Sequence, residues 1–87
     1  MRVEIRDFVI ASLKEMNYDV GGIDDDTTLG PAGVDLESLS LAELAVRVED
    51  RFKVKFGEDE SEQLAMMSVG EFVATVTDRV AQTNGMR

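Results

Sequence analysis

One serine stands where its hydroxyl could take part in chemistry. Ser38 follows an irregular stretch that ends in Leu36 and Glu37, and it opens a run of apolar residues at helical spacing. At the start of a helix several backbone N–H groups have no partner, and the positive end of the helix dipole favours a phosphate. Ser38 is therefore suited to carrying a phosphodiester. For a serine considered alone, a simple helix N-cap is the commoner role.

The usual catalytic side chains are missing from the sequence. None of the 87 residues is Cys or His. Their absence excludes disulfides, thiolate nucleophiles and Cys-ligated zinc, and it removes Ser-His catalysis and the commonest metal ligand. We therefore expect no catalytic residues and a protein that is not an enzyme.

Three consecutive acids, at positions 24–26, raise the question of a calcium site. An EF-hand loop that starts at Asp24 needs a Gly at its sixth position and a Glu at its twelfth. Those positions hold Leu29 and Asp35. We expect a solvated acidic loop and no metal site.

The residues around Ser38 form a longer pattern. Leu36 lies two positions before the serine and Leu39 directly after it, while Glu43 and Leu44 follow at the fifth and sixth positions. This register resembles that of the acyl and peptidyl carrier protein family. The resemblance covers nearly the whole chain, including the long first loop, a short third helix and the Ser-Val-Gly-Glu-Phe start of the last helix. The acidic, aromatic-ended second helix of the family is matched by Glu49, Asp50 and Phe52.

Membership of this family implies a 4′-phosphopantetheine cofactor bound covalently to Ser38, which a phosphopantetheinyl transferase moves there from coenzyme A. The thiol of that arm would carry acyl or aminoacyl intermediates as thioesters between loading enzymes and ketosynthase or condensation-type enzymes. Ser40 is a weaker candidate for the modification, because it would place Glu43 at the third position after it and lacks the rest of the register. We interpret Ser40 as an exposed helical residue.

Two positions depart from the usual family pattern. Glu37 stands where Asp is usual, which keeps the charge, and Asp35 stands where Gly is usual, which removes backbone freedom. Gly33 lies five positions before the serine instead of three. These departures, with the basic residues between 47 and 55, favour a polyketide or other secondary-metabolite pathway, while fatty acid and peptide pathways stay open. The alternative function is a cofactor-free acidic module that binds a basic partner. The basic residues are Arg47, Arg51, Lys53 and Lys55.

Charged residues beside Ser38 suggest a docking surface for partner enzymes. At about 100° per residue, Glu43 and Arg47 lie one helical turn apart and Asp50 continues the same row. A solvated face that only keeps the protein soluble is the alternative interpretation. The predicted docking residues are Glu37, Leu39, Glu43, Arg47, Glu49 and Asp50.

The elements that must position these residues are helices. Apolar periodicity predicts helices over 3–16 and 38–52, separated by a long loop at 17–33 that is rich in Gly and Asp. A short third helix follows Gly57, with Asp59 and Glu62 as a capping pair. Ser68 and Glu71 have capping-box spacing, and Met67 and Phe72 have the spacing of a hydrophobic staple, so a fourth helix is predicted over 68–82. We expect an all-α fold, a small four-helix bundle formed by a single domain at 1–82, with a flexible tail at 83–87.

The overall charge narrows the choice of partners. Eighteen Asp and Glu against nine Lys and Arg give a net charge of −9, the wrong sign for binding nucleic acid. The same negative charge disfavours binding to anionic lipids. No apolar run approaches the roughly 20 residues that are needed to span a bilayer. The first ten residues carry acids within their apolar stretch, unlike a signal peptide. We expect a cytoplasmic monomer that binds neither nucleic acid nor membrane.

Overall fold

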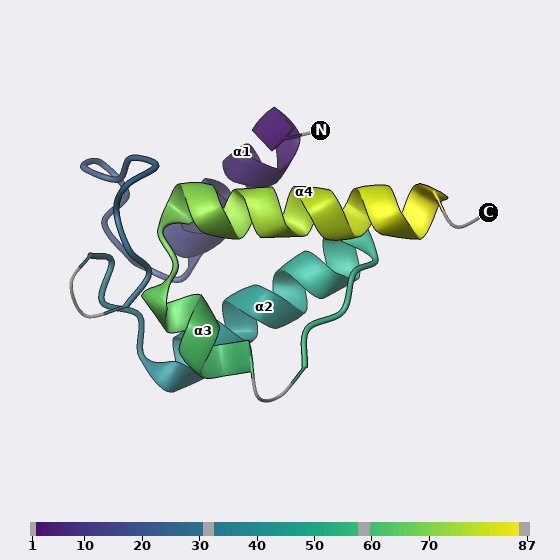
Figure 1. Ribbon diagram of the computed structural model, residues 1–87. Coiled ribbons are helices and arrows are strands. Elements are labelled where there is room, and N and C mark those ends of the chain that lie inside the picture. The colour runs from purple at the N-terminus through teal and green to yellow at the C-terminus, as the bar shows by residue number, and fades with distance from the viewer. Residues whose placement is uncertain (1, 31–32, 58–59, 86–87) are drawn as a thin grey trace.

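The computed structural model describes residues 2–30, 33–57 and 60–85, and these form four helices and no strand. The helices are α1 (Arg2–Glu15), α2 (Ser38–Phe52), α3 (Ser61–Met66) and α4 (Val69–Gly85), as Figure 1 shows. The prediction of an all-α bundle with three longer helices and a short third helix is confirmed. Within the same ranges, no helix combines the length and the apolarity that crossing a bilayer requires.

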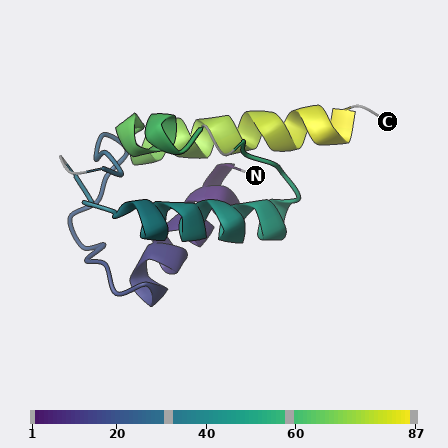
Figure 2. The same cartoon turned by 90° about the horizontal axis from the view of Figure 1, so that it is seen from below.

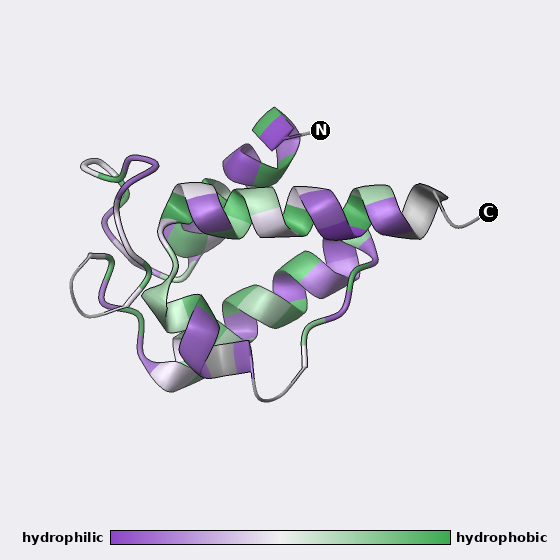
Figure 3. Cartoon of the chain, in the orientation of Figure 1, coloured by the Kyte–Doolittle hydropathy of each residue, from purple (hydrophilic) through white to green (hydrophobic). Residues whose placement is uncertain are grey.

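The two longest helices, α2 and α4, run lengthwise through the molecule, and α1 crosses them (Figures 1 and 2). α1 packs against both α2 and α4, while α3 packs against α2. Hydrophobic and hydrophilic residues alternate along the helices (Figure 3), as helices with one buried face require. The buried apolar residues include Ile5, Val9 and Leu13 of α1, Leu41, Leu44, Ala45 and Val48 of α2, and Val69, Phe72, Val73, Val76 and Val80 of α4.

The boundaries of α1 and α2 agree closely with the sequence patterns. α2 has the predicted bounds, and α1 begins and ends one residue before the predicted 3–16. The loop between them covers residues 16–37, apart from positions 31–32 outside the described ranges. Helix ends often differ by a residue or two, because terminal turns lack the full set of hydrogen bonds.

α4 begins with the predicted capping box. The Ser68 N–H donates to Oε1 of Glu71 at 3.0 Å, and the Glu71 N–H donates to Oγ of Ser68 at 3.1 Å. Met67 and Phe72, the predicted staple pair, both belong to the central apolar cluster. The capping box therefore fixes where the last helix starts.

The other end of α4 differs from the prediction. The helix continues to Gly85, so the predicted end at Gln82 is wrong. The apolar repeat stops at Val80, but no helix breaker occurs before Gly85, and backbone hydrogen bonding continues through the polar residues. Residues 86–87, and Asp59 of the predicted capping pair of α3, lie outside the described ranges. The N-cap of α3 is Glu60, which makes no side-chain capping bond.

Candidate modification site at the start of α2

Ser38 is the first helical residue of α2, not its cap. The N-cap is Glu37, whose backbone is extended (φ −73°, ψ 162°) and whose side chain makes no capping bond. The first turn closes through the Leu41 N–H, which donates to the carbonyl oxygen of Glu37 at 2.8 Å. Ser38 is exposed, and its hydroxyl has no hydrogen-bond partner in the described parts of the chain. The interpretation of Ser38 as an N-cap is therefore wrong.

The loop before Ser38 is fixed by two buried leucines. Leu29 and Leu36 are almost fully buried, and the Leu36 N–H donates to the Leu29 carbonyl at 3.0 Å. The Leu29 N–H in turn donates to the carbonyl of Met67, next to α4, also at 3.0 Å. Thr28 and Ser68 form an isolated antiparallel bridge at the same place. The chain therefore enters α2 from a segment that is attached to the start of α4.

The two departures around Gly33 and Asp35 have a structural explanation. Asp35 has a φ of 64°, in the left-handed region that favours glycine and that Asp tolerates better than most residues. Gly33 lies against the backbone of Thr28, and a Cβ at this position would overlap the Thr28 carbonyl and amide. The glycine is required where it stands, and Asp35 carries the backbone strain two residues later.

Ser40 is not the exposed residue that we expected. It is half-buried, and its Oγ accepts a hydrogen bond from the Tyr18 hydroxyl at 2.8 Å. The reason is tertiary, because Tyr18 lies in the loop after α1, 22 positions away in the sequence. Of the two serines, Ser38 alone presents an exposed hydroxyl at the start of the helix.

The predicted docking residues lie along α2 mostly as the helical spacing requires. Glu37, Leu39, Glu43 and Asp50 are all exposed, with Leu39 81% exposed. Arg47 is half-buried among acids. Its guanidinium lies 3.2 Å from Oε2 of Glu43 and 3.7 Å from Oε2 of Glu15 at the end of α1. These ion pairs offset the charge of Arg47 and of its acidic partners, and they add Glu15 of α1 to the charged surface along α2.

Glu49 lies apart from that row. Its side chain is half-buried and accepts a hydrogen bond from the Phe56 N–H at 2.7 Å. Six positions from Glu43 correspond to about 600°, which places the two side chains on different sides of the helix. Glu49 therefore supports the segment after α2.

Sequence reasoning did not predict that two apolar side chains are exposed. Val46 of α2 is 59% exposed and Met66 of α3 is 79% exposed. A shallow hollow of about 270 Å³ lies between α2 and α3, with Val46, Phe56 and Leu64 in its lining. The exposure of Val46 could have been predicted, because this apolar residue does not lie on the buried face of α2. Met66 gave no such signal, because α3 is too short for a clear periodic pattern.

The acids at 24–26 serve the loop itself. Oδ1 of Asp24 accepts hydrogen bonds from the Asp26 N–H at 2.9 Å and from the Thr27 hydroxyl at 3.1 Å. Asp25 pairs with Arg6 at 3.1 Å. Within the described ranges, no cluster of three acids has the arrangement of a metal site.

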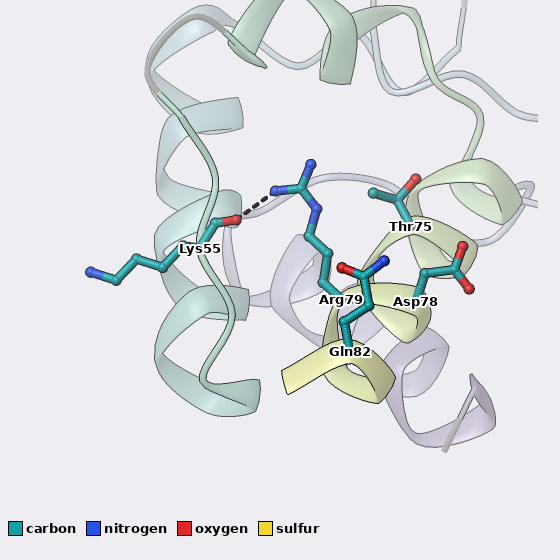
Figure 4. A pocket seen from close by; sticks show the side chains of 5 residues that line it. All are labelled: Lys55, Thr75, Asp78, Arg79 and Gln82. Atoms are coloured by element: carbon teal, nitrogen blue, oxygen red, sulfur yellow. Dashed lines mark hydrogen bonds between the residues drawn. The ribbon is translucent and has the colours of Figure 1, made fainter. Parts of the chain in front are cut away.

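A polar hollow of about 470 Å³ lies beside the segment that follows α2, at the other end of that helix from Ser38 (Figure 4). Arg79 of α4 reaches across it to the carbonyl of Lys55, lies 4.8 Å from the centre of the Phe56 ring, and pairs with Glu60. Two hydrogen bonds hold the pKa of Glu60 below its usual value. The larger effect comes from the bond that Arg79 donates, and the smaller one from the bond that the Gly57 N–H donates. Arg79 is engaged in these contacts, which hold the segment after α2 against α4. We therefore assign the residues of this hollow a structural role.

Comparison of the chain with protein-family models, curated proteins and solved structures found no match.

Proposed function

We propose that this protein is an acyl carrier protein, modified at Ser38 by 4′-phosphopantetheine. The observation that carries the proposal is the exposed, unpartnered hydroxyl of Ser38 at the first residue of α2. It lies within the register of Leu36, Leu39, Glu43 and Leu44 that resembles the carrier family. A structural serine at a helix start normally uses its hydroxyl to cap the helix, and this one does not.

The start of α2 fits a phosphodiester chemically. The first intrahelical donor is the Leu41 N–H, so the amides of Ser38, Leu39 and Ser40 precede the helical hydrogen-bond ladder. Such amides, with the positive end of the helix dipole, stabilise a phosphate. When bound, the prosthetic arm supplies a thiol for thioester formation, a group that the Cys-free chain does not have. The chain itself presents the hydroxyl and a surface for partner enzymes.

The surface that partners would contact is the row formed by Leu39, Glu43, Val46 and Asp50, which we call the docking row. These residues follow at spacings of four, three and four positions, so they share one side of α2. All are exposed, and apolar side chains alternate with acids. A phosphopantetheinyl transferase with an apolar surface bordered by basic residues would complement this row. The carried group is an intermediate of a polyketide or other specialised pathway.

Intact-protein mass spectrometry tests the proposal. Incubation with coenzyme A and a broad-specificity phosphopantetheinyl transferase should add the mass of one phosphopantetheine. A known carrier protein in the same reaction is the control for transferase activity. If the control is modified and this chain is not, the cofactor-free interaction module is the better account.

The docking row has its own test in the kinetics of that reaction. Glu43→Lys combined with Asp50→Lys should raise the apparent KM of loading, and increasing salt should slow the wild type, because charge steering is screened by ions. The matched control is Asp7→Lys with Asp78→Lys, which makes the same change in net charge at exposed positions on α1 and α4. Equal loading kinetics for both double variants across a salt series would contradict the assignment of this row.

A further inference from the structure

Near its start, the loop after α1 contains a tightly fixed residue, Tyr18. Asn17 ends the helix with a φ of 70°, in the left-handed region. The Asn17 N–H donates to the Lys14 carbonyl, and the Tyr18 N–H donates to the Leu13 carbonyl, both at 3.0 Å. This pair of bonds is the Schellman arrangement that closes many helices. It holds the backbone of Tyr18 at a defined place relative to α1.

The side chain of Tyr18 extends from that place to α2. Tyr18 is half-buried and packs against the apolar core, and its hydroxyl donates to Oγ of Ser40 at 2.8 Å. The bond is partly buried, so water competes with it less than with a surface bond. It connects the end of α1 with the third residue of α2.

In the first turn of α2, Leu41 is buried in the core, whereas the residues before it receive little other side-chain support. Its N-cap, Glu37, makes no side-chain capping bond, and Ser38 and Leu39 are exposed. The buried side chain of Leu36, just before the helix, attaches the N-terminal side of the turn to the core. The Tyr18–Ser40 bond provides an attachment on the other side, and it leaves the Ser38 hydroxyl free.

We propose that Tyr18 is a positioning residue for the modification of Ser38, acting through Ser40. This inference rests on the proposed function. When the bond is intact, the first turn of α2 stays closed and presents Ser38 to the transferase in one conformation. When it is absent, the turn opens more often, and only the closed fraction binds productively. Such a loss raises KM and leaves kcat unchanged.

Hydrogen exchange of the Leu41 amide measures the closure of that turn directly, because this N–H makes its first helical bond. Tyr18→Phe keeps the ring and removes the donor, and Ser40→Ala removes the acceptor. Each should speed Leu41 exchange about two- to tenfold, the factor expected for one neutral hydrogen bond. Each should also raise the KM of loading, by no more than that factor. Thr77→Val is the matched control, since the hydroxyl of Thr77 bonds the Val73 carbonyl within α4.

The two variants combined provide the decisive comparison. Because they remove the same bond, the double variant should exchange at Leu41 no faster than the more affected single variant. Additive effects, or exchange that Tyr18→Phe leaves at the wild-type rate, would overturn the proposal. So would a KM of Tyr18→Phe that departs from the ratio of closed fractions that hydrogen exchange gives for wild type and variant. If the wild type is not loaded at all, the proposed function fails, whereas the exchange data still decide whether Tyr18 holds the turn closed.

Discussion

The two ends of α2 are held by different kinds of interaction. At its C-terminal end, the ring of Phe52 meets that of Phe8 edge to face, with centroids 5.4 Å apart. In the segment that follows, the ring of Phe56 stacks on that of Phe72, with centroids 5.8 Å apart. The guanidinium of Arg79 lies over the Phe56 ring. At the N-terminal end, Ser38 and Leu39 are exposed. Backbone bonds, the buried side chains of Leu36 and Leu41, and the Tyr18–Ser40 bond hold that end.

Because of this difference, one end of α2 contributes more to stability and the other end is more accessible to partners. Aromatic pairs and buried side chains contribute several kcal/mol, whereas single hydrogen bonds contribute about 1 kcal/mol each. With its strong contacts at one end, the chain can leave the other end exposed for a partner. Substitutions at the aromatic end should therefore change stability, and substitutions of the exposed residues at the Ser38 end should change loading.

The largest expected effect on stability is at Phe72. Its side chain is fully buried and stacked on Phe56, so Phe72→Ala should lower the free energy of unfolding by about 3–5 kcal/mol. Urea titration followed by circular dichroism measures the loss. The loading rate, expressed per folded molecule, should stay near that of the wild type. A loss below 1 kcal/mol would mean that this end does not carry the stability.

An intermediate effect is expected at Gly33, in the loop that leads to Ser38. Gly33→Ala places a Cβ against the backbone of Thr28, which must move to make room for it. This movement should lower the free energy of unfolding by about 1–3 kcal/mol. Gly22→Ala in the same loop is the control, because a Cβ at that position meets no atom within 4 Å. Melting temperatures of the two variants test the contrast. Equal melting temperatures would show that the loop does not pack as described.

A smaller effect, with a defined pH dependence, is expected at Glu60. Because its pKa is lowered by the hydrogen bond from Arg79, its contribution to stability is present above the pKa of the unfolded chain and is lost as pH falls through the folded value. Glu60→Gln should reduce stability by about 1 kcal/mol at pH 7, with a difference that shrinks as pH falls below 4.5. Denaturant titrations between pH 7 and pH 3 measure this trend.

Glu62→Gln removes an exposed carboxylate from α3, which Glu60 directly precedes, and serves as the control for Glu60. It should change stability by less than about 0.5 kcal/mol at each pH. A difference between wild type and Glu60→Gln that stays constant with pH would contradict the role assigned to the Arg79 pair.

Local patterns in the sequence were sufficient to predict much of the fold. The bounds of α2 followed from its apolar repeat, and the start of α4 followed from Ser68 and Glu71, whose reciprocal bonds the structure contains. Both signals depend on residues within four positions of one another. The predicted end of α4 failed because a polar turn can continue a helix without adding to its apolar stripe.

Contacts between distant segments could not be predicted in the same way. The attachment of Leu29 to Met67 uses backbone groups, which leave no mark in the sequence. The assignment of Ser40 as exposed failed because Tyr18 reaches it from another element. Ser38 was found through its spacing to Leu39 and Glu43, but the freedom of its hydroxyl became visible only in three dimensions.

The most direct test of the account is the location of the modification, measured by intact-protein mass after loading of wild type, Ser38→Ala and Ser40→Ala. Since the Ser38 hydroxyl makes no capping bond, Ser38→Ala should fold with wild-type stability within about 0.5 kcal/mol and gain no mass. Wild type and Ser40→Ala should each gain one phosphopantetheine. A gain by Ser38→Ala, or no gain by the wild type while a control carrier is modified, would contradict the central claim.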